Sequence, residues 1–144
     1  MVTNDFQFGG VVMEKRFYPR VVKQFSAVVE NLDGVHLEVV AVDASSEGIC
    51  IQCNTTERDL ITPGGSFVSN GKPVELFVWL NLPFEGEVAK KIRARCHVAF
   101  SRRLSKDQCK IGMRYMEFEA GMQDTLLKYI ESVNASNDIE SIAL

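Results

Sequence analysis

The clearest structural signal in the chain is FSAVVENLDGVHLEVVAVDASSEGICIQC, residues 25–53. Its first part, Phe25–Glu30, is rich in β-branched and aromatic residues and is followed by an Asp-Gly turn signal. Val35–Val42 is apolar on both of its alternating faces, which fits a strand inside a barrel or a sandwich. The chain then bends at Asp43–Gly48 and resumes as a strand at Ile49–Cys53. This stretch therefore predicts an antiparallel β-domain.

The rest of the chain extends this pattern and then changes it. Further strands are predicted at Val74–Leu80, Lys91–Arg102 and Lys110–Phe118. Residues 54–72 are rich in Gly, Ser, Thr and Asn and are interpreted as a long connection. Gly121–Val133 carries a single apolar stripe at helical spacing, so it is predicted to be a helix. Many short strands followed by one terminal helix indicate a mainly β fold, a small antiparallel barrel or sandwich with a C-terminal α-helix.

Composition limits the classes of protein to which the chain can belong. Its 144 residues are 46% hydrophobic and 24% charged, which is typical of one soluble globular domain. A net charge of −3 argues against a non-specific nucleic-acid binder, so neither DNA nor RNA is an expected partner. No apolar stretch is long enough to span a membrane, and residues 1–10 lack the pattern of a signal peptide. Together with four cysteines, which indicate reduced thiols, this predicts a cytoplasmic protein without membrane insertion.

Two short motifs carry the chemical information. Arg16-Phe17-Tyr18-Pro19-Arg20 has the form R-x-x-x-R, and Asp43-Ala44-Ser45-Ser46-Glu47-Gly48 has the form D-x-S-x-x-G. An arginine fork can bind the O6 and N7 acceptors of guanine, or grip a phosphate with two hydrogen bonds. A carboxylate accepts hydrogen bonds from the N1–H and N2–H donors on the opposite edge of guanine, and a glycine lets the backbone approach a bulky ligand. Together, the motifs are complementary to a guanine nucleotide.

In this order, the two motifs resemble the PilZ domain, the bacterial receptor module for cyclic di-GMP. The resemblance covers a PilZ-like domain at 14–133. Residues 1–13, which lack clear periodicity, are interpreted as a flexible N-terminal arm or a short added strand, and residues 134–144 as a polar C-terminal tail. The resemblance implies a six-stranded antiparallel β-barrel, a split barrel, with a C-terminal α-helix. It also implies that R-x-x-x-R lies on a loop just before the first barrel strand, and that D-x-S-x-x-G lies at a strand junction on the barrel surface.

The resemblance also implies roles for the motif residues in binding cyclic di-GMP. Arg16 and Arg20 would contact guanine and phosphate groups, and Asp43 would accept hydrogen bonds from a guanine edge. Ser45 would hydrogen-bond the base or a phosphate, and Gly48 would allow the ligand to approach closely. The alternative is that the arginines are solvated surface charges and that Asp43 to Gly48 is merely a turn, since Asp, Ser and Gly all favour turns.

Three further basic residues are candidates for additional contacts. Lys15 directly precedes the first motif and is a candidate contact to a second, stacked nucleotide, which occurs in some members of the family. Arg102 and Arg103 lie at the end of a predicted strand and are candidates for phosphate contacts. For all three residues, the alternative is a side chain that is simply solvated.

The cysteines raise a different hypothesis. Cys50 and Cys53 form a C-x-x-C, but redox pairs of this type usually begin a helix, whereas this run is predicted to be a strand. A zinc site would need two more ligands, for which the candidates are Cys96, His97 and Cys109. The sequence has no second C-x-x-C and no paired histidine motif. Core packing of the cysteines is therefore favoured, and no metal or cofactor is expected.

No spacing in the sequence indicates a catalytic constellation: His36 and His97 are isolated, and Trp79 and the nine phenylalanines are interpreted as core. The favoured hypothesis is a receptor that is not an enzyme, binds cyclic di-GMP and changes conformation. It would act through an unidentified effector protein, because the chain carries no second domain. In the family, such partners include motility, chemotaxis, polysaccharide and secretion machinery. The alternatives are a PilZ-like protein-interaction module that acts without nucleotide, and a cysteine-based metal or redox protein.

Overall fold

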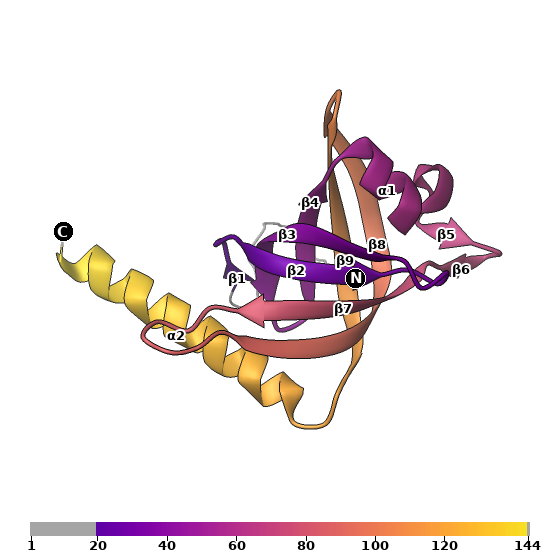
Figure 1. Cartoon of the computed structure of the whole chain (residues 1–144). Helices are drawn as coiled ribbons and strands as arrows, with labels where there is room; N and C mark the ends of the chain where they lie inside the picture. The colour runs from indigo at the N-terminus through magenta and orange to yellow at the C-terminus, as the bar shows by residue number, and fades with distance from the viewer. Residues whose placement is uncertain (1–19, 144) are drawn as a thin grey trace, which may run out of the picture.

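The computed structural model describes residues 20–143, with side chains over residues 21–135, and the protein is a closed β-barrel with a C-terminal helix (Figure 1). The barrel strands are β2 (Phe25–Glu30), β3 (His36–Ser45), β4 (Gly48–Cys53), β7 (Glu75–Leu82), β8 (Lys90–Ser105) and β9 (Gln108–Phe118). Their order is β3-β2-β7-β8-β9-β4, and antiparallel pairing of β3 with β4 closes the barrel. The predicted mainly β fold, with six antiparallel strands and a C-terminal helix, is confirmed. The predicted arm at 1–13 lies outside the described residues.

Alternation along the strands builds the barrel core. On β7, Leu76, Val78 and Leu80 are fully buried, and the residues between them are only partly buried. On β4, Ile49 and Ile51 are buried in the same core. Side chains on a strand alternate between the two faces, so one set fills the interior and the other faces outward.

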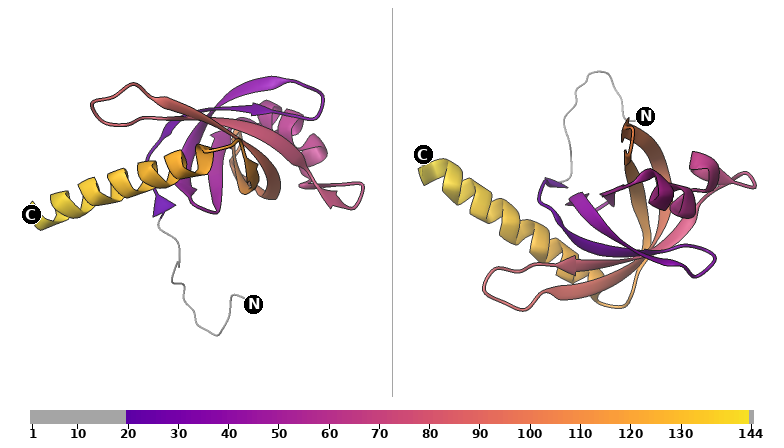
Figure 2. Two further views of the ribbon diagram at one scale, coloured as in Figure 1. Left: turned by 90° about the horizontal axis from the view of Figure 1, so that it is seen from below. Right: turned by 45° about the horizontal axis from the view of Figure 1, so that its top comes forward.

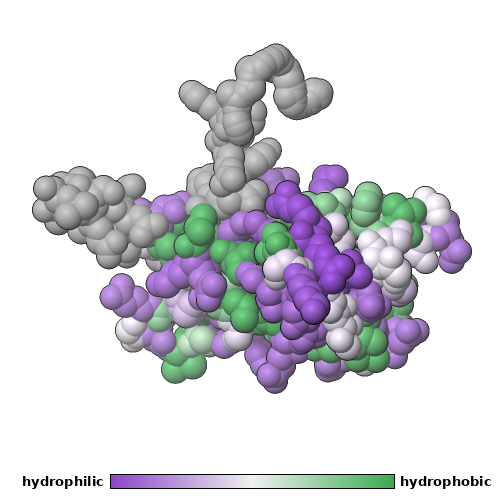
Figure 3. Space-filling view, turned by 90° about the horizontal axis from the view of Figure 1, so that it is seen from above, coloured by the Kyte–Doolittle hydropathy of each residue, from purple (hydrophilic) through white to green (hydrophobic). Residues whose placement is uncertain are grey.

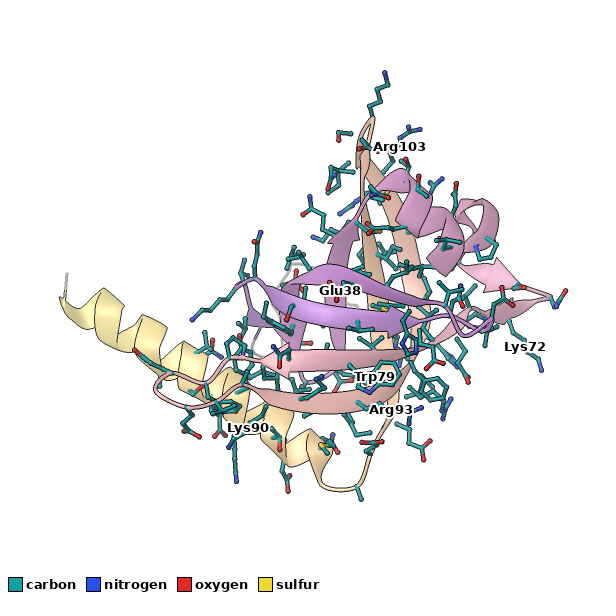
Figure 4. The ribbon with its side chains drawn as sticks, viewed as in Figure 1. Glu38, Lys72, Trp79, Lys90, Arg93 and Arg103 are labelled. Carbon is teal, nitrogen blue, oxygen red and sulfur yellow. The ribbon has the colours of Figure 1, made fainter. Side chains whose placement is uncertain are left out.

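Trp79 lies on the outer face of the barrel, so the prediction that it belongs to the core is wrong. Its neighbours Val78 and Leu80 take the inward positions on β7, which leaves Trp79 the outward one. There its ring centroid lies 5.4 Å from the His36 ring and 5.2 Å from the guanidinium carbon of Arg93. Figure 4 shows Trp79 and Arg93 together on this face.

Helix α2 (Met122–Ala143) packs against the barrel through a short apolar face. The buried members of that face are Leu126, Tyr129, Ile130 and Val133. The Tyr129 ring meets the rings of Phe25 and Phe84 edge to face, each at a centroid distance of 5.7 Å. The helix also contacts β1 (Arg20–Val21), a short strand paired with β3.

The helix continues past Val133, where the sequence analysis placed the start of a polar tail. Neither glycine nor proline occurs in residues 134–143, so the backbone has no residue that disfavours helix strongly. In both views of Figure 2 the second half of α2 projects beyond the strands. Among the described residues, no helix combines the length and apolar character needed to cross a membrane.

The connection between β4 and β7 contains structure that the composition of residues 54–72 did not indicate. It holds α1 (Thr55–Ile61), the 3₁₀ turn η1 (Pro63–Gly65), β5 (Val68–Ser69) and β6 (Lys72–Pro73). A capping box begins α1: the Asn54 side chain accepts from the Glu57 N–H at 2.7 Å, and the Asn54 N–H donates to the Glu57 carboxylate at 2.8 Å. The spacing of Asn54 and Glu57 was the available sequence signal for this helix.

The packing of Tyr129 predicts that this residue anchors α2. Tyr129→Ala should lower the free energy of unfolding by about 3–5 kcal/mol, the usual range for removing a buried aromatic side chain. Leu127→Ala, on the partly exposed face of the same helix, is the matched control and should have a much smaller effect. Urea unfolding followed by Trp79 fluorescence and circular dichroism measures both, and equal effects would show that Tyr129 does not hold the helix.

Candidate functional site

A β-bulge in β3 sets the direction of the acidic motif residue. In the pairing of β3 with β4, Ala41 lies opposite Ile51 and Asp43 lies opposite Cys50, so Val42 is an extra residue without a counterpart. Ala41 and Ile51 are both core residues, and Cys50 takes the next, outward position on β4. Asp43 shares that outward face because it lies opposite Cys50. The bulge thus turns Asp43 out of the barrel. Bulges are often found beside functional sites, where they redirect a side chain in this way.

Ser45 holds the turn between β3 and β4. Its Oγ accepts hydrogen bonds from the backbone N–H groups of Glu47, at 3.1 Å, and Gly48, at 3.3 Å. The residue itself is only 3% exposed. The serine of D-x-S-x-x-G therefore has a structural task in this chain, since its hydroxyl accepts from two backbone donors of the turn.

Gly48 is required by the packing of one strand on another. It begins β4 opposite Arg114 of β9. A β-carbon at this position would overlap the backbone carbonyl oxygen of Met113. The close approach that the sequence analysis expected from a ligand is thus made by the backbone of β9.

The pairing of β1 with β3 brings the two motifs together. Arg20 lies opposite Ser45, and Val21 lies opposite Ala44. The sequence analysis expected Arg20 on a loop, whereas the structure places it in the short strand β1. Arg16 and Lys15 lie outside the described residues. The backbone of the second arginine of R-x-x-x-R is therefore held directly beside the D-x-S-x-x-G motif.

A pocket of about 450 Å³ lies next to this junction. Among its described lining residues, Asp43 supplies the one carboxylate, and the cationic side chains are Lys23, Arg102 and Lys110. Valines and a leucine contribute apolar wall, namely Val22, Val42 and Leu104. The face seen in Figure 3 likewise mixes hydrophilic and hydrophobic patches. Charged groups beside apolar surface are the combination that nucleotide-sized ligands require.

The structure separates the two candidate arginines of β8. Arg102 lines the pocket, whereas Arg103 donates from Nε to the Ser105 carbonyl at 3.1 Å and from a terminal nitrogen to the Lys106 carbonyl at 2.7 Å. Figure 4 shows Arg103 near the tip of the β8–β9 hairpin. Neighbouring residues of a strand point to opposite faces, so only one of the pair can face the pocket.

The four cysteines are buried and form no disulfide. Cys53, Cys96 and Cys109 belong to the hydrophobic core, which confirms the predicted core packing for these three, whereas Cys50 takes an outward position on β4. Burial raises the pKa of the Cys53 and Cys96 thiols to about 12. Thiols of this kind are not activated nucleophiles, because the thiolate form is disfavoured. Over the described part of the chain, no three His, Cys, Asp or Glu side chains gather in a way that could hold a metal ion.

Among solved structures, the Bacillus subtilis inhibitor of motility, MotI/DgrA, has a similar fold. The two proteins are 21% identical in sequence, with a TM-score of 0.63 over 86% of this chain. The chain spans about half of the length of that protein, 53%. No protein-family model matches the sequence, and no curated protein gives a significant match. At this level of identity the likeness shows a shared fold.

The tight packing at Gly48 predicts a loss of stability when a side chain is added there. Gly48→Ala should lower the free energy of unfolding by about 1–3 kcal/mol, because β4 must move away from β9. Ser46→Ala, in the same turn, serves as the control and should change stability by less than about 0.5 kcal/mol. Chemical denaturation of both variants tests this, and a Gly48→Ala protein as stable as the control would contradict the packing argument.

The raised thiol pKa values predict that the protein loses stability at alkaline pH. The Cys53 and Cys96 thiols have a pKa of about 12 in the folded state, against about 8.5 in an unfolded chain. Between these values the unfolded state releases protons that the folded state keeps. The free energy of unfolding should therefore fall as pH rises above about 9, by up to about 1.4 kcal/mol per pH unit for each thiol.

Urea unfolding at pH 7.5, 9 and 10.5 measures this dependence. Other groups also titrate in this range, so the comparison is with Cys96→Ala, which removes one of the two thiols. The variant should show a shallower fall than the parent over the same pH range. Parallel curves for the two proteins would mean that the Cys96 thiol does not contribute.

Proposed function

We propose that this protein is a receptor for cyclic di-GMP and has no catalytic activity of its own. The observation that carries the proposal is the register of β1 on β3, which holds Arg20 opposite Ser45 and next to the pocket that Asp43 lines. The sequence motifs suggested this ligand by their chemistry, and the fold brings the parts of both motifs that it describes to one place. The wider resemblance to the PilZ domain supports the same ligand.

In this proposal Asp43 recognises the base. A carboxylate accepts hydrogen bonds and does not donate them, so it suits the N1–H and N2–H edge of guanine and repels the acceptor N1 of adenine. The apolar side chains of Val22 and Leu104 offer a surface for the flat face of a purine. Arg16 and Arg20 would bind guanine or phosphate oxygens through their guanidinium forks.

Ser45 and Gly48 take a supporting part in this proposal. The Ser45 hydroxyl accepts hydrogen bonds from the backbone of the β3–β4 turn, and Gly48 permits β4 to lie close to β9. Both therefore fix the strand end that carries Asp43. We assign direct base recognition to Asp43 and the arginines, and assign the positioning of Asp43 to Ser45 and Gly48.

We further propose that the receptor works in the cytoplasm through a protein partner. Ligand binding that orders a segment can create or hide a contact surface, which is an established mode of switching. MotI/DgrA, which shares the fold, is described as an inhibitor of motility. Motility machinery is therefore the first class of partner to test, ahead of chemotaxis, polysaccharide and secretion machinery.

Calorimetric titration with cyclic di-GMP tests the ligand, with cyclic di-AMP and GTP as controls. We expect selective binding of cyclic di-GMP in the low-micromolar range or tighter. Arg20→Ala and Asp43→Ala should each weaken binding at least tenfold, while circular dichroism remains that of the parent. Lys72→Ala removes a cation from the β5–β6 hairpin, which Figure 4 shows away from the proposed site, and should bind like the parent.

Two outcomes would contradict the assignment. Undiminished binding by Arg20→Ala and Asp43→Ala would place the ligand elsewhere on the protein. An absence of heat and of any thermal shift with all three nucleotides would exclude the receptor function. The remaining hypothesis would then be an interaction module that acts without nucleotide, and the parent and Arg20→Ala proteins would be expected to capture the same partner.

A further inference from the structure

We propose that the β8–β9 hairpin forms a phosphate-binding wall of the pocket, with Arg102 and Lys110 on one side and Lys23 on the other. The ligand class is a nucleotide phosphate or phosphodiester. The identity of that nucleotide rests on the proposed function, whereas the anion site rests on the arrangement of the three cations. Neither Lys23 nor Lys110 belongs to the two motifs.

The first observation is a cross-strand pair of like charges. In the register of β8 and β9, Arg102 lies directly opposite Lys110. Opposed residues of an antiparallel pair have neighbouring side chains on one face, and like charges in that position are destabilising. An anion bound between the two side chains would remove the repulsion and gain two charge-assisted hydrogen bonds.

The second observation is that none of the three cations forms an ion pair with a carboxylate within the part of the chain that the structure describes. Elsewhere on the barrel the arrangement is different: Arg93 and Arg95 both pair with nearby glutamates at 3.1–3.6 Å. Among the lining residues that the structure describes, Lys23, Arg102 and Lys110 face a single carboxylate, which gives an excess of two positive charges.

The third observation concerns how Arg102 is held. Its guanidinium carbon lies 5.6 Å from the centre of the Phe100 ring, two residues earlier on the same face of β8. The Phe100 ring packs on Gly112 of β9, where a β-carbon would overlap it. Phe100 is thus fixed on the hairpin and supports the guanidinium through a cation–π contact. An arginine that rests on an aromatic ring loses less freedom when it binds an anion.

The geometry also explains why the three cations act together. Lys23 belongs to the connection between β1 and β2, whereas Arg102 and Lys110 belong to the β8–β9 hairpin. Gln52 of β4 lies opposite Lys110 and adds a polar side chain to the pocket lining. A phosphate in the pocket would therefore be held from two segments that are far apart in the sequence, next to Asp43.

The test uses Arg102→Gln, Lys110→Gln and the double variant, with Arg103→Gln as the matched control. Arg103 is adjacent in sequence and carries the same charge, but its guanidinium is bound to carbonyls at the hairpin tip. Each pocket variant should weaken cyclic di-GMP binding by about tenfold or more, and Arg103→Gln by less than about twofold. The double variant should also show a shallower dependence of affinity on salt, because fewer charges contact the ligand.

A second probe keeps this inference separate from the identity of the ligand. Inorganic pyrophosphate is titrated into the parent protein, and the backbone amide resonances of Lys23, Arg102 and Lys110 are followed by NMR. We expect saturable shifts at these residues in the parent and in Arg103→Gln, and their loss in the double variant. Because removal of the like-charge pair should not weaken the fold, the double variant should unfold at the parent's urea midpoint or higher.

The outcomes distinguish the two proposals. If cyclic di-GMP binding depends on Asp43 but not on Arg102 and Lys110, the receptor function stands and the phosphate wall is wrong. If cyclic di-GMP does not bind at all, yet pyrophosphate shifts the three residues and the double variant abolishes the shifts, the anion site stands and the receptor function is wrong. If pyrophosphate causes no shifts, or causes equal shifts in the double variant, the anion site is overturned.

Discussion

The bulge at Val42 is the constraint on which the rest of the site depends. The pairing of β3 with β4 closes the barrel, so the inward positions of both strands must be apolar where they pair. A strict period of two from Ala41 would send Asp43 inward as well. One inserted residue changes the phase, so that Ala44 returns to the core while Asp43 faces the pocket. Barrel closure and the outward carboxylate are thus obtained from the same short piece of backbone.

The D-x-S-x-x-G motif combines two kinds of requirement. Ser45 satisfies the backbone of the turn, and Gly48 lets β4 lie against β9, so both are explained by folding. Asp43 lines the pocket, and this position is what connects the motif to the proposed ligand. The short strand β1 then brings Arg20 to the same place. The site is therefore assembled from one strand end, one turn and one edge pairing.

The fold was predictable because runs of β-branched and aromatic residues separated by turn signals mark the strands, and because the two motifs resemble those of the PilZ domain. The misses have physical reasons. The helix α1 begins with an Asn54–Glu57 capping box inside a stretch whose composition is that of a loop. Trp79 is apolar enough for the core, but its parity on β7 places it outside. The distinction between Arg102 and Arg103 needed the register of β8 on β9, which shifts at three places and cannot be counted from the sequence.

The close contact of Gly48 with β9 has a consequence for how this motif should be interpreted across evolution. Selection for a folded barrel alone would retain the glycine and the serine of the turn, whereas it would not retain the aspartate. The presence of Ser45 and Gly48 is therefore evidence of the fold and of common descent, and is not evidence of a ligand. When paralogues of this chain are compared, loss of the aspartate or of the arginine opposite Ser45 would therefore indicate loss of the proposed function.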